Sequence, residues 1–410
     1  MTGSGWLILA LVLMLAGVLT HGPVLFLGGI ILVLLAVAVG LWSRYCLDRL
    51  EYGRRFSVRR AFCGEEIGFD VRLVNRKPLP LAWVIVDDEL PSDLVLRGVT
   101  MLSSHKPLRN ILSNLLSLSW YEAVTRRYRL DCRHRGYYSF GPAIVRTGDL
   151  FGFATRTLDL DAEDMLLIYP RVVALSELGI PSRQLFGDLT TRQQLVQDPL
   201  RVVGVRGYAA GDSLRRVHWK ATARTGELQI KVLESTTSRD IVLFLNVSTF
   251  EPDWQGIVPG LLELGIITAA AIANAALTTG ESLGLYVNTN LPGSDQPARI
   301  RPADGPGQLT AILETLAMIK PFATVPMDRF LAREARVLRW SATIVLVTAV
   351  INNQLLSTLL HLRRAGRRVA LIAIGPDGAS VRLPGVPTYP VSEWQPWDEV
   401  QTVELRATRG

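Results

Sequence analysis

Three residues in the middle of the chain have the chemistry of a hydrolytic site. Asp212 and His218 lie close together in the sequence, and Ser248 follows later. A serine nucleophile needs a base within hydrogen-bond reach, and a carboxylate usually orients that base. The sequence identifies no base for Ser248, and His218 stands next to Trp219, where we expect a packed residue or one at the rim of a helix. A hydrolase of unknown substrate that uses the Asp212, His218 and Ser248 region is therefore the alternative hypothesis.

Other motifs of catalysis and cofactor binding are absent from the sequence. It contains no G-x-x-x-x-G-K-[ST] phosphate loop, no H-E-x-x-H zinc motif, no C-x-x-C pair and no G-x-S-x-G turn. The three cysteines, at positions 46, 63 and 132, have no paired spacing and fit a reducing compartment. We therefore assign no catalytic residue and no cofactor, and we expect a protein that is not an enzyme.

A row of cationic side chains marks the stretch 202–234. Arg216, Lys220 and Arg224 recur at intervals of four, which places them on one face of a helix. We predict that Asp212 caps this helix at its N-terminus, because a carboxylate there can accept hydrogen bonds from the free amides of the first turn. The sequence thus predicts a short helix with a cationic face.

Two interpretations of these cations are open. They form a docking surface for an acidic partner or a phosphate, or they are neutralised by acidic residues of the same chain while Trp219 fills the core. In the second interpretation, Arg215 or Arg224 would pair with Asp212, Glu227, Glu234 or Asp240. The residues assigned to partner binding are Arg206, Asp212, Arg215, Arg216, Lys220 and Arg224.

The same stretch resembles the signature of the domain of unknown function 58 family of bacteria and archaea. The residues that carry the resemblance are Arg206, Tyr208, Gly211, Asp212, Arg215, Val217, Trp219, Lys220, Ala223 and Arg224. The resemblance implies a membrane-anchored protein whose biochemical activity is not established. It also implies two partners, a MoxR-type AAA ATPase and a transglutaminase-like membrane protein.

By the same resemblance, the last domain is expected to have a von Willebrand type A-like fold, in which an Asp-x-Ser-x-Ser loop after the first strand binds a metal. The corresponding residues here are Asn246, Ser248 and Phe250. A hard divalent cation prefers anionic oxygen, whereas Asn246 offers a neutral carbonyl and Phe250 offers no oxygen. The loop 350–353 after a later strand also lacks an acidic residue. We therefore predict a degenerate site without a metal.

The first 42 residues contain no charged side chain, and two apolar runs, 6–20 and 24–42, flank His21-Gly22-Pro23. A single helix over both runs would be about 55 Å long, whereas the hydrocarbon core of a bilayer is about 30 Å thick. We therefore predict a transmembrane helical hairpin over residues 1–43. A cleaved signal peptide is the alternative, but the chain lacks a basic start and a convincing cleavage site.

A cluster of arginines follows the apolar segment. Its members are Arg44, Arg49, Arg54, Arg55, Arg59 and Arg60, against only Asp48 and Glu51. Such an excess holds its side of the membrane in the cytoplasm. We expect a multi-pass protein of the plasma membrane with cytoplasmic soluble domains. The cluster supplies much of the net charge of +7, so the lipid bilayer is the expected partner of these cations and nucleic acid is not.

The remaining chain divides into two regions by its hydrophobic pattern. Short alternating runs over 52–170 predict an antiparallel β-sandwich. Residues 171–201 are predicted to be a connector. Apolar strands alternate with helical segments over 202–400, which predicts a doubly wound α/β domain behind the signature motif. The whole chain is thus predicted to be a membrane-anchored multidomain protein, and we expect a non-catalytic interaction or scaffold protein that acts in complex maturation or envelope processes.

Overall fold

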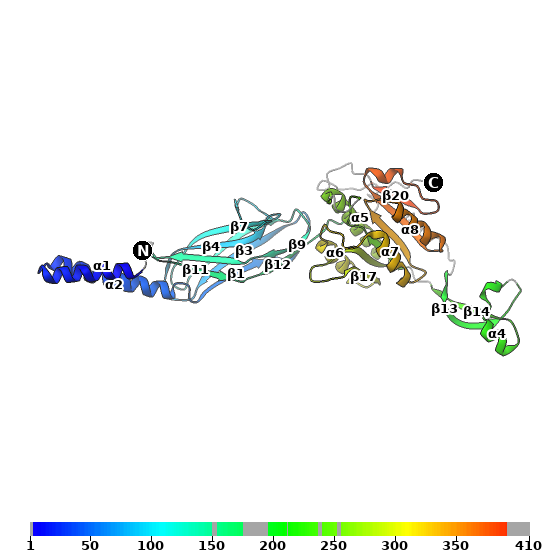
Figure 1. The fold of residues 1–410 in the computed structure, drawn as a ribbon, viewed down its shortest axis with the longest axis horizontal. Coiled ribbons are helices and arrows are strands. Elements are labelled where there is room, and N and C mark those ends of the chain that lie inside the picture. The colour runs from blue at the N-terminus through cyan, green and yellow to red at the C-terminus, as the bar shows by residue number, and fades with distance from the viewer. Residues whose placement is uncertain are drawn as a thin grey trace. The chain divides into compact units, whose positions relative to one another are not determined.

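The structure is a computed structural model that describes residues 3–149, 154–174, 196–210, 212–236, 240–251 and 256–391. The chain forms two compact units, Met1–Tyr169 and Pro170–Gly410. Figure 1 shows the elements of each unit. The predicted connector at 171–201 falls mostly outside the described residues. Its last part, 196–201, belongs to a strand instead.

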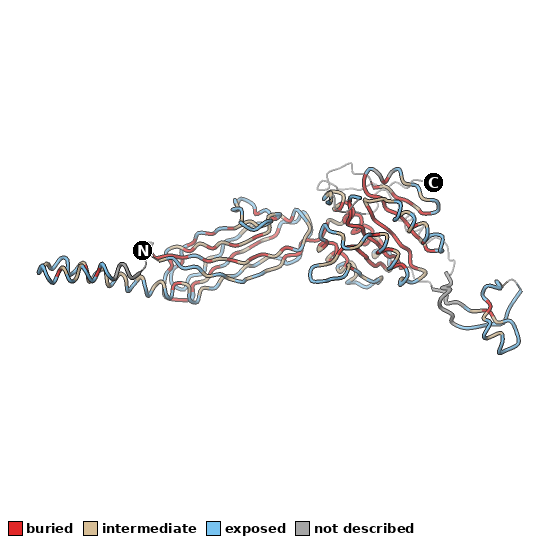
Figure 2. Tube along the Cα trace, in the orientation of Figure 1, coloured by how far each residue is buried: buried red, intermediate tan, exposed pale blue. Residues whose placement is uncertain are grey.

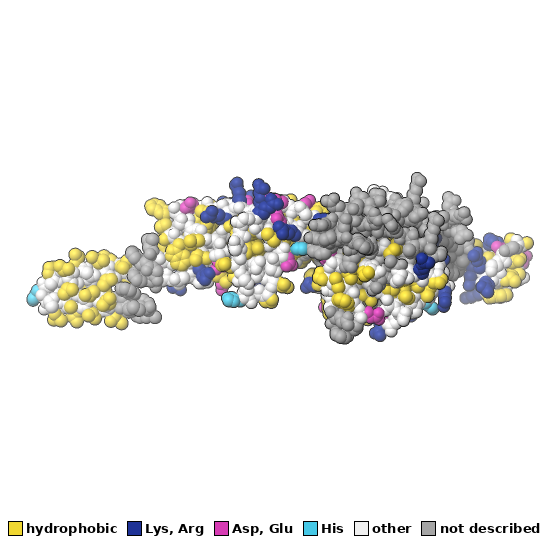
Figure 3. All heavy atoms as spheres, turned by 90° about the horizontal axis from the view of Figure 1, so that it is seen from above, with side chains coloured by type: hydrophobic (Ala, Val, Ile, Leu, Met, Phe, Trp, Pro, Cys, Tyr) yellow, Lys and Arg dark blue, Asp and Glu magenta, His cyan; other side chains and the backbone are white. Residues whose placement is uncertain are grey.

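The first unit begins with two apolar helices, α1 (Gly3–Leu19) and α2 (Pro23–Tyr45). They pack closely, since a Cβ atom added at Gly29 would lie 2.3 Å from Cγ of Met14, and one at Gly17 would lie 2.5 Å from the backbone nitrogen of Phe26. Helix α2 is long and apolar enough to cross a membrane, and α1 carries the shorter apolar stretch Ile8–Leu19. Most of the described positions in both helices are exposed or half-buried (Figure 2), and hydrophobic side chains cover the visible face of this pair (Figure 3).

The rest of the first unit is β-rich. Its strands are β1 (Leu50–Phe56), β2 (Arg60–Phe62), β3 (Glu66–Asn75), β4 (Leu81–Pro91), β5 (Val95–Leu96), β6 (Leu102–Ser103), β7 (Arg109–Leu118), β8 (Ala123–Asp131), β9 (Gly136–Phe140), β10 (Ala143–Gly148), β11 (Thr155–Leu160) and β12 (Asp164–Tyr169). They form sheets in the orders β1-β3-β8-β5, β11-β10-β4-β7-β6 and β2-β12-β9. All pairs are antiparallel except β2 with β12. Alternate residues of β3, β4 and β7 are buried, as the period-two pattern predicts.

Arg54 does not belong to the predicted cluster of exposed cations that follows the apolar segment. Its side chain is fully buried, and it forms a two-pronged ion pair with Asp88, with Nη2 2.6 Å from Oδ1 and Nε 2.8 Å from Oδ2. The hydroxyl of Tyr52 donates to the same carboxylate. Burial raises the pKa of Tyr52, and the nearby Asp88 carboxylate raises it further. Arg54 therefore stabilises the β-rich region and does not face a membrane.

The second unit contains a six-stranded sheet in the order β17-β16-β15-β18-β19-β20. The strands are β15 (Asp240–Leu245), β16 (Ser282–Asn290), β17 (Pro297–Ala303), β18 (Thr343–Thr348), β19 (Arg368–Ile374) and β20 (Thr388–Val391). Its helices are α5 (Pro259–Thr278), α6 (Gln308–Met318), α7 (Met327–Val337), α8 (Asn353–Arg364) and the 3₁₀ helix η4 (Pro376–Ser380). Only β17 is antiparallel to its neighbour.

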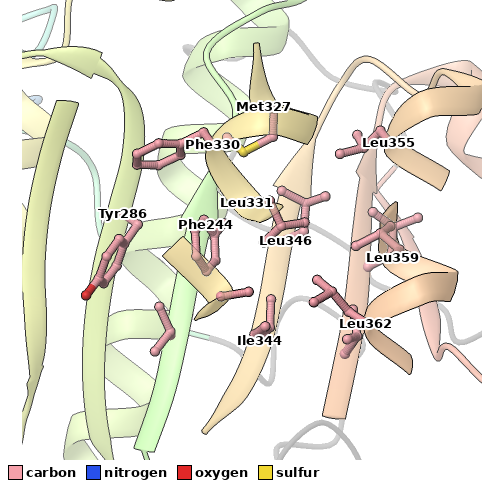
Figure 4. Close-up of a cluster of buried hydrophobic side chains, with 14 of the residues drawn as sticks. Phe244, Tyr286, Met327, Phe330, Leu331, Ile344, Leu346, Leu355, Leu359 and Leu362 are labelled. Atoms are coloured by element: carbon pink, nitrogen blue, oxygen red, sulfur yellow. The ribbon is translucent and has the colours of Figure 1, made fainter. Parts of the chain in front are cut away.

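The core of this sheet is almost entirely apolar. Every residue of β15 and β18 is buried, as expected for parallel strands that helices cover on both faces. Phe244 and Tyr286 from the sheet have their rings in contact, and the ring of Phe330 from helix α7 packs edge-on against Phe244 (Figure 4). Helix α5 also has the length and composition of a membrane span, but 67% of its apolar window is buried inside the protein, so it is a core helix here.

A small lobe precedes this sheet in sequence. It consists of β13 (Val196–Gly207), the 3₁₀ helix η2 (Leu214–Arg216), α4 (Trp219–Thr225) and β14 (Gln229–Thr236), and β13 pairs with β14 in antiparallel register. The predicted single helix after Asp212 is wrong. Val217 forms a β-bridge with Ile230 instead, and the amide of His218 donates to the carbonyl of Gln229. These bonds to β14 divide the segment into η2 and a helix of only seven residues.

Candidate functional site

Arg206 and Asp212 hold each other at the turn of the lobe. The guanidinium donates to both carboxylate oxygens, at 2.7 and 2.6 Å, and the amide of Ala209 donates to Asp212 at 2.9 Å. The hydrogen bonds from Arg206 and Ala209 lower the pKa of Asp212, and Asp212 raises the pKa of Arg206. Asp212 is therefore not the predicted helix N-cap. These two residues shape the turn, and each has an ionic partner within the lobe.

His218 takes the capping role. It is the N-cap of α4, and its Nδ1 accepts a hydrogen bond from the amide of Ala221 at 3.1 Å. Gly226 ends the helix in the left-handed region, with φ of 73°. Both ends of this short helix are thus fixed by local hydrogen bonds, and the imidazole of His218 has a structural partner.

The cations beyond Arg206 are exposed. Arg215, Lys220 and Arg224 form no ion pair with any described residue of the chain, and Arg216 lies close enough to Asp212 to lower the pKa of that carboxyl. Of the acidic residues expected to neutralise them, Asp212 binds Arg206 and Asp240 binds Arg339 at 3.2 Å. Glu227 forms no ion pair within the described chain, and the side chain of Glu234 lies outside it. Within the described residues, ion pairs of the same chain therefore do not neutralise Arg215, Lys220 and Arg224.

Large apolar side chains stand beside the cations. Trp219 is 71% exposed and Leu214 is 66% exposed, whereas Val217 and Ile230 are buried. The expectation that Trp219 fills the core is wrong, because a lobe this small has too little interior to enclose an indole. Figure 3 shows Lys and Arg side chains next to hydrophobic ones on the visible face of the lobe. The exposure of Trp219 and Leu214 was missed from sequence, although the shortness of the segment was a signal for it.

A pocket of about 230 Å³ lies at the strand ends of the α/β sheet. From β15 the chain continues to β16 on one side of the sheet, and from β18 it continues to β19 on the other side. The pocket opens beside this change of direction, which is where ligands usually bind in such sheets. Its lining includes Asn246, Ser248, Phe250, Glu251, Asp328 and Asn352. The structure thus places all three residues of the predicted degenerate loop at one site.

Asn246 is fully engaged in a buried hydrogen-bond network. Its Oδ1 accepts from the amide of Ser248 at 3.1 Å and from Nδ2 of Asn288 at 2.9 Å, and its Nδ2 donates to Oγ1 of Thr348 at 3.0 Å. The side-chain Oδ1 of Asn288 in turn accepts from the amide of Val247. Asn288 and Thr348 were not identified from sequence, because their importance depends on strands β16 and β18 lying on either side of β15. The network ties the three strand ends together.

This arrangement offers poor ligands for a cation. The carbonyl oxygen of Asn246 already accepts two hydrogen bonds, and Phe250 contributes no oxygen. Within the described ranges, no three His, Cys, Asp or Glu side chains gather in a metal-binding group. The carboxylates of Glu251 and Asp328 are the acidic groups of the pocket lining.

The residues of the alternative hydrolytic site have separate local partners. Asp212 binds Arg206, His218 caps α4, and Ser248 donates its amide to Asn246 at the end of β15. A catalytic triad requires the base to face the nucleophile and the carboxylate to face the base. The hydrogen bonds of Asp212 and His218 serve the lobe instead.

Comparisons with known proteins bear on the second unit and on the whole chain. The family described as "Protein of unknown function DUF58" matches residues 204–409, half of the chain. The uncharacterized protein YeaD of Bacillus subtilis (strain 168) is 26% identical over 379 residues, which cover 90% of this chain and 88% of YeaD.

Two solved structures match only part of the chain. A cohesin module from a Clostridium perfringens family 33 glycoside hydrolase is 14% identical, covers 28% of this chain and 96% of its own, and has a TM-score of 0.20. The CARDB domain of the PF1109 protein from Pyrococcus furiosus is 12% identical, covers 29% of this chain and 91% of its own, and has a TM-score of 0.19. Similarities at this level carry no argument about the fold or the function.

Proposed function

This chain belongs to the DUF58 family of proteins of unknown function, and from that premise we propose that it is a membrane-anchored, non-catalytic docking protein. The surface that we propose for docking comprises Arg215, Lys220 and Arg224 with the exposed side chains of Leu214 and Trp219. The observation that supports it best is the exposure of Trp219 beside cations that have no acidic partner among the described residues.

The composition of this docking surface suits a protein partner with an acidic face. Tryptophan and arginine are the residues most often found at the energetic centres of protein interfaces, and opposite charge steers association and fixes orientation. The resemblance of the signature stretch suggests the identity of the partners. We propose a MoxR-type AAA ATPase, with a transglutaminase-like membrane protein as a further member of the complex.

The anchor is proposed to be a transmembrane hairpin of α1 and α2. The close approach of the two helices at Gly17 and Gly29 and the outward-facing apolar side chains of both support it. Arg44, Arg49 and Arg55 remain exposed after α2, although Arg54 does not. This excess of cations favours a cytoplasmic position for both soluble units and for both termini, at the plasma membrane.

The α/β unit is proposed to be a von Willebrand type A-like domain whose metal site has degenerated. The strand order, with β15 at the centre and an antiparallel edge strand, supports this assignment. The neutral network of Asn246, Asn288 and Thr348 stands where such a domain would hold its cation. In this proposal the unit is a rigid frame that presents strand-end loops, and it performs no metal chemistry.

Recovery of partners from native membranes tests the docking surface. We expect a tagged full-length chain to recover the ATPase, and a triple variant, Arg215→Glu, Lys220→Glu and Arg224→Glu, to lose at least tenfold of that recovery with an unchanged melting temperature. The matched control reverses Arg72, Arg126 and Arg127, three exposed cations of the β-rich region, and should recover the partner normally. A large drop in melting temperature for the first variant would instead support internal pairing of the cations.

A further inference from the structure

Several loops of the β-rich region lie together at the end where helix α2 joins it. Strands β3, β7 and β10 end there, and β4, β8 and β11 begin there, as their antiparallel registers require. The indole of Trp42 donates to the carbonyl of Pro80, and Arg156 donates to the hydroxyl of Ser43. The last part of α2 is therefore packed against these loops and is not separated from them by a linker.

The position of this contact along α2 gives its depth relative to a bilayer. The contact residues of the helix, Leu35, Ala38, Val39 and Trp42, follow Pro23 by 12 to 19 residues, or about 18 to 28 Å at 1.5 Å per residue. The hydrocarbon core is about 30 Å thick. If the turn before Pro23 lies at the far surface, as the proposed anchor requires, these residues lie in the leaflet nearer to the β-rich region.

An apolar groove occupies this position. It has a volume of about 500 Å³ and lies between those four residues of α2 and the segments 79–82 and 117–119 of the β-rich region. Among the residues that the structure describes, its polar lining consists of Ser117, Ser119, Gly148 and Asp149. Asp149 is buried, and its carboxylate accepts from the amide of Ala154. The volume falls within the range of about 300 to 1,000 Å³ that is usual for small-molecule sites.

Aromatic side chains mark the same end as a membrane interface. Trp120 and Tyr121, in the turn between β7 and β8, are 68% and 67% exposed. They directly follow the groove segment 117–119. Tryptophan and tyrosine favour the headgroup level of a bilayer, where one side of the ring is apolar and the other is wet. Arg44 and Arg49 are exposed at the end of α2 and can bind lipid phosphate there.

We propose that this groove binds the acyl chain of a bilayer phospholipid, and that the loops of the β-rich region enter the adjacent leaflet. The inference rests on the proposed membrane anchor but not on the docking surface. Lipid is the solvent at this depth, so an apolar groove open to it fills with hydrocarbon. The bound lipid would fix the angle between α2 and the β-rich region.

Photolabelling in vesicles tests the site. The full-length protein is reconstituted into vesicles of phosphatidylethanolamine and phosphatidylglycerol that carry a trace of phospholipid with a diazirine near the end of one acyl chain. Labelled positions are mapped by mass spectrometry. We expect labels on α1 and α2 and also on segments 79–82 and 117–119.

A pair of variants on one helix makes the test specific. Ala38→Phe places a ring in the groove and should reduce labelling of the two segments at least fivefold. Val37→Phe changes an exposed neighbour that does not line the groove and should leave the labelling unchanged. Labels on the helices with none on 79–82 or 117–119, or equal labelling in Ala38→Phe, would overturn the lipid site alone. Absence of labels from the helices as well would overturn the membrane anchor with it.

Discussion

Asn246 illustrates how a single side-chain amide can join three strands of a sheet. It accepts two hydrogen bonds through its carbonyl and donates one through its amide nitrogen, so it connects β15 to both neighbouring strands. The hydroxyl of Thr348 already donates to the carbonyl of Val350 at 2.8 Å and accepts from the amide of Val350 at 3.1 Å, so toward position 246 its oxygen can only accept. A carboxylate at position 246 has no hydrogen to donate to that oxygen and would place one acceptor against another, so the neutral amide is the side chain that fits the network.

An acidic residue at position 246 should therefore weaken the network. Asn246→Asp should destabilise the α/β unit by about 1–3 kcal/mol at pH 7, because the new carboxylate faces an acceptor in a buried site. Burial and that acceptor raise the folded-state pKa of the new group above its unfolded value of about 3.9. The penalty is therefore fully present above the folded pKa and disappears as the pH falls below the unfolded pKa. Hydrogen exchange of β15 and β18 measures it.

The neighbouring Asn290 offers a matched control. Its Oδ1 only accepts a hydrogen bond, from the hydroxyl of Thr324 at 3.0 Å, so Asn290→Asp should retain that bond and cost less than about 0.5 kcal/mol. Titration calorimetry with Mg²⁺ should detect no saturable binding to Asn246→Asp. If that variant were as stable as the parent at pH 7 and bound Mg²⁺, the network would be a dormant metal site and our account of Asn246 would be wrong.

At the scale of elements, the lobe depends on its turns more than on a core. Gly226 has φ of 73°, and a Cβ atom added there would meet nothing within 4 Å. Gly226→Ala should therefore destabilise the lobe through backbone strain alone, by about 1 kcal/mol. The measurement is hydrogen exchange of the amides in α4 and β14. Gly204→Ala is the control, since Gly204 also has open space around its Cβ position but lacks a positive φ.

The two glycine variants separate strain from crowding. Faster exchange in Gly226→Ala with unchanged exchange in Gly204→Ala is the expected result. Equal exchange in both variants would show that the left-handed C-cap does not hold the lobe together.

The elements that the sequence predicted well are those whose hydrophobic pattern is local. Fully apolar strands between helical segments indicated β15, β18 and β19. The edge strand β17 was missed because its arginines and prolines do not resemble a buried strand. The helix after Asp212 was predicted wrongly because helical periodicity cannot reveal that Val217 bridges to Ile230 across the lobe.

Burial of individual polar residues was less predictable. Arg54 has the same sequence context as the exposed arginines around it, and only the position of Asp88 on a different strand makes it a core residue. The partners of the residues at the strand ends were also hidden from the sequence. Asn246, Ser248 and Phe250 could be placed there from their position after an apolar strand, but their partners Asn288 and Thr348 come from strands that pair only in the folded sheet.

For the whole molecule, the decisive question is whether the proposed anchor crosses the bilayer once or twice. The helices α1 and α2 are joined at Thr20, His21 and Gly22, and they lie against each other along much of their length. In a hairpin, this turn lies on the opposite side of the membrane from the β-rich region. If α2 crosses alone, α1 must leave it, although a Cβ at Gly29 would already collide with Met14. Close packing therefore favours the hairpin.

Labelling of introduced cysteines with a membrane-impermeant maleimide tests this topology. In intact cells without their outer layers, His21→Cys should be labelled, whereas Thr2→Cys before α1 and Ser103→Cys, an exposed position on β6, should both be protected; in inverted membrane vesicles the pattern should reverse. Native Cys46, Cys63 and Cys132 are buried or half-buried, so the parent chain gives the background. Labelling of Thr2→Cys together with His21→Cys would exclude a hairpin. Labelling of His21→Cys and Ser103→Cys from the same side would show that α2 does not cross, and it would remove the basis for placing the groove of α2 inside a leaflet.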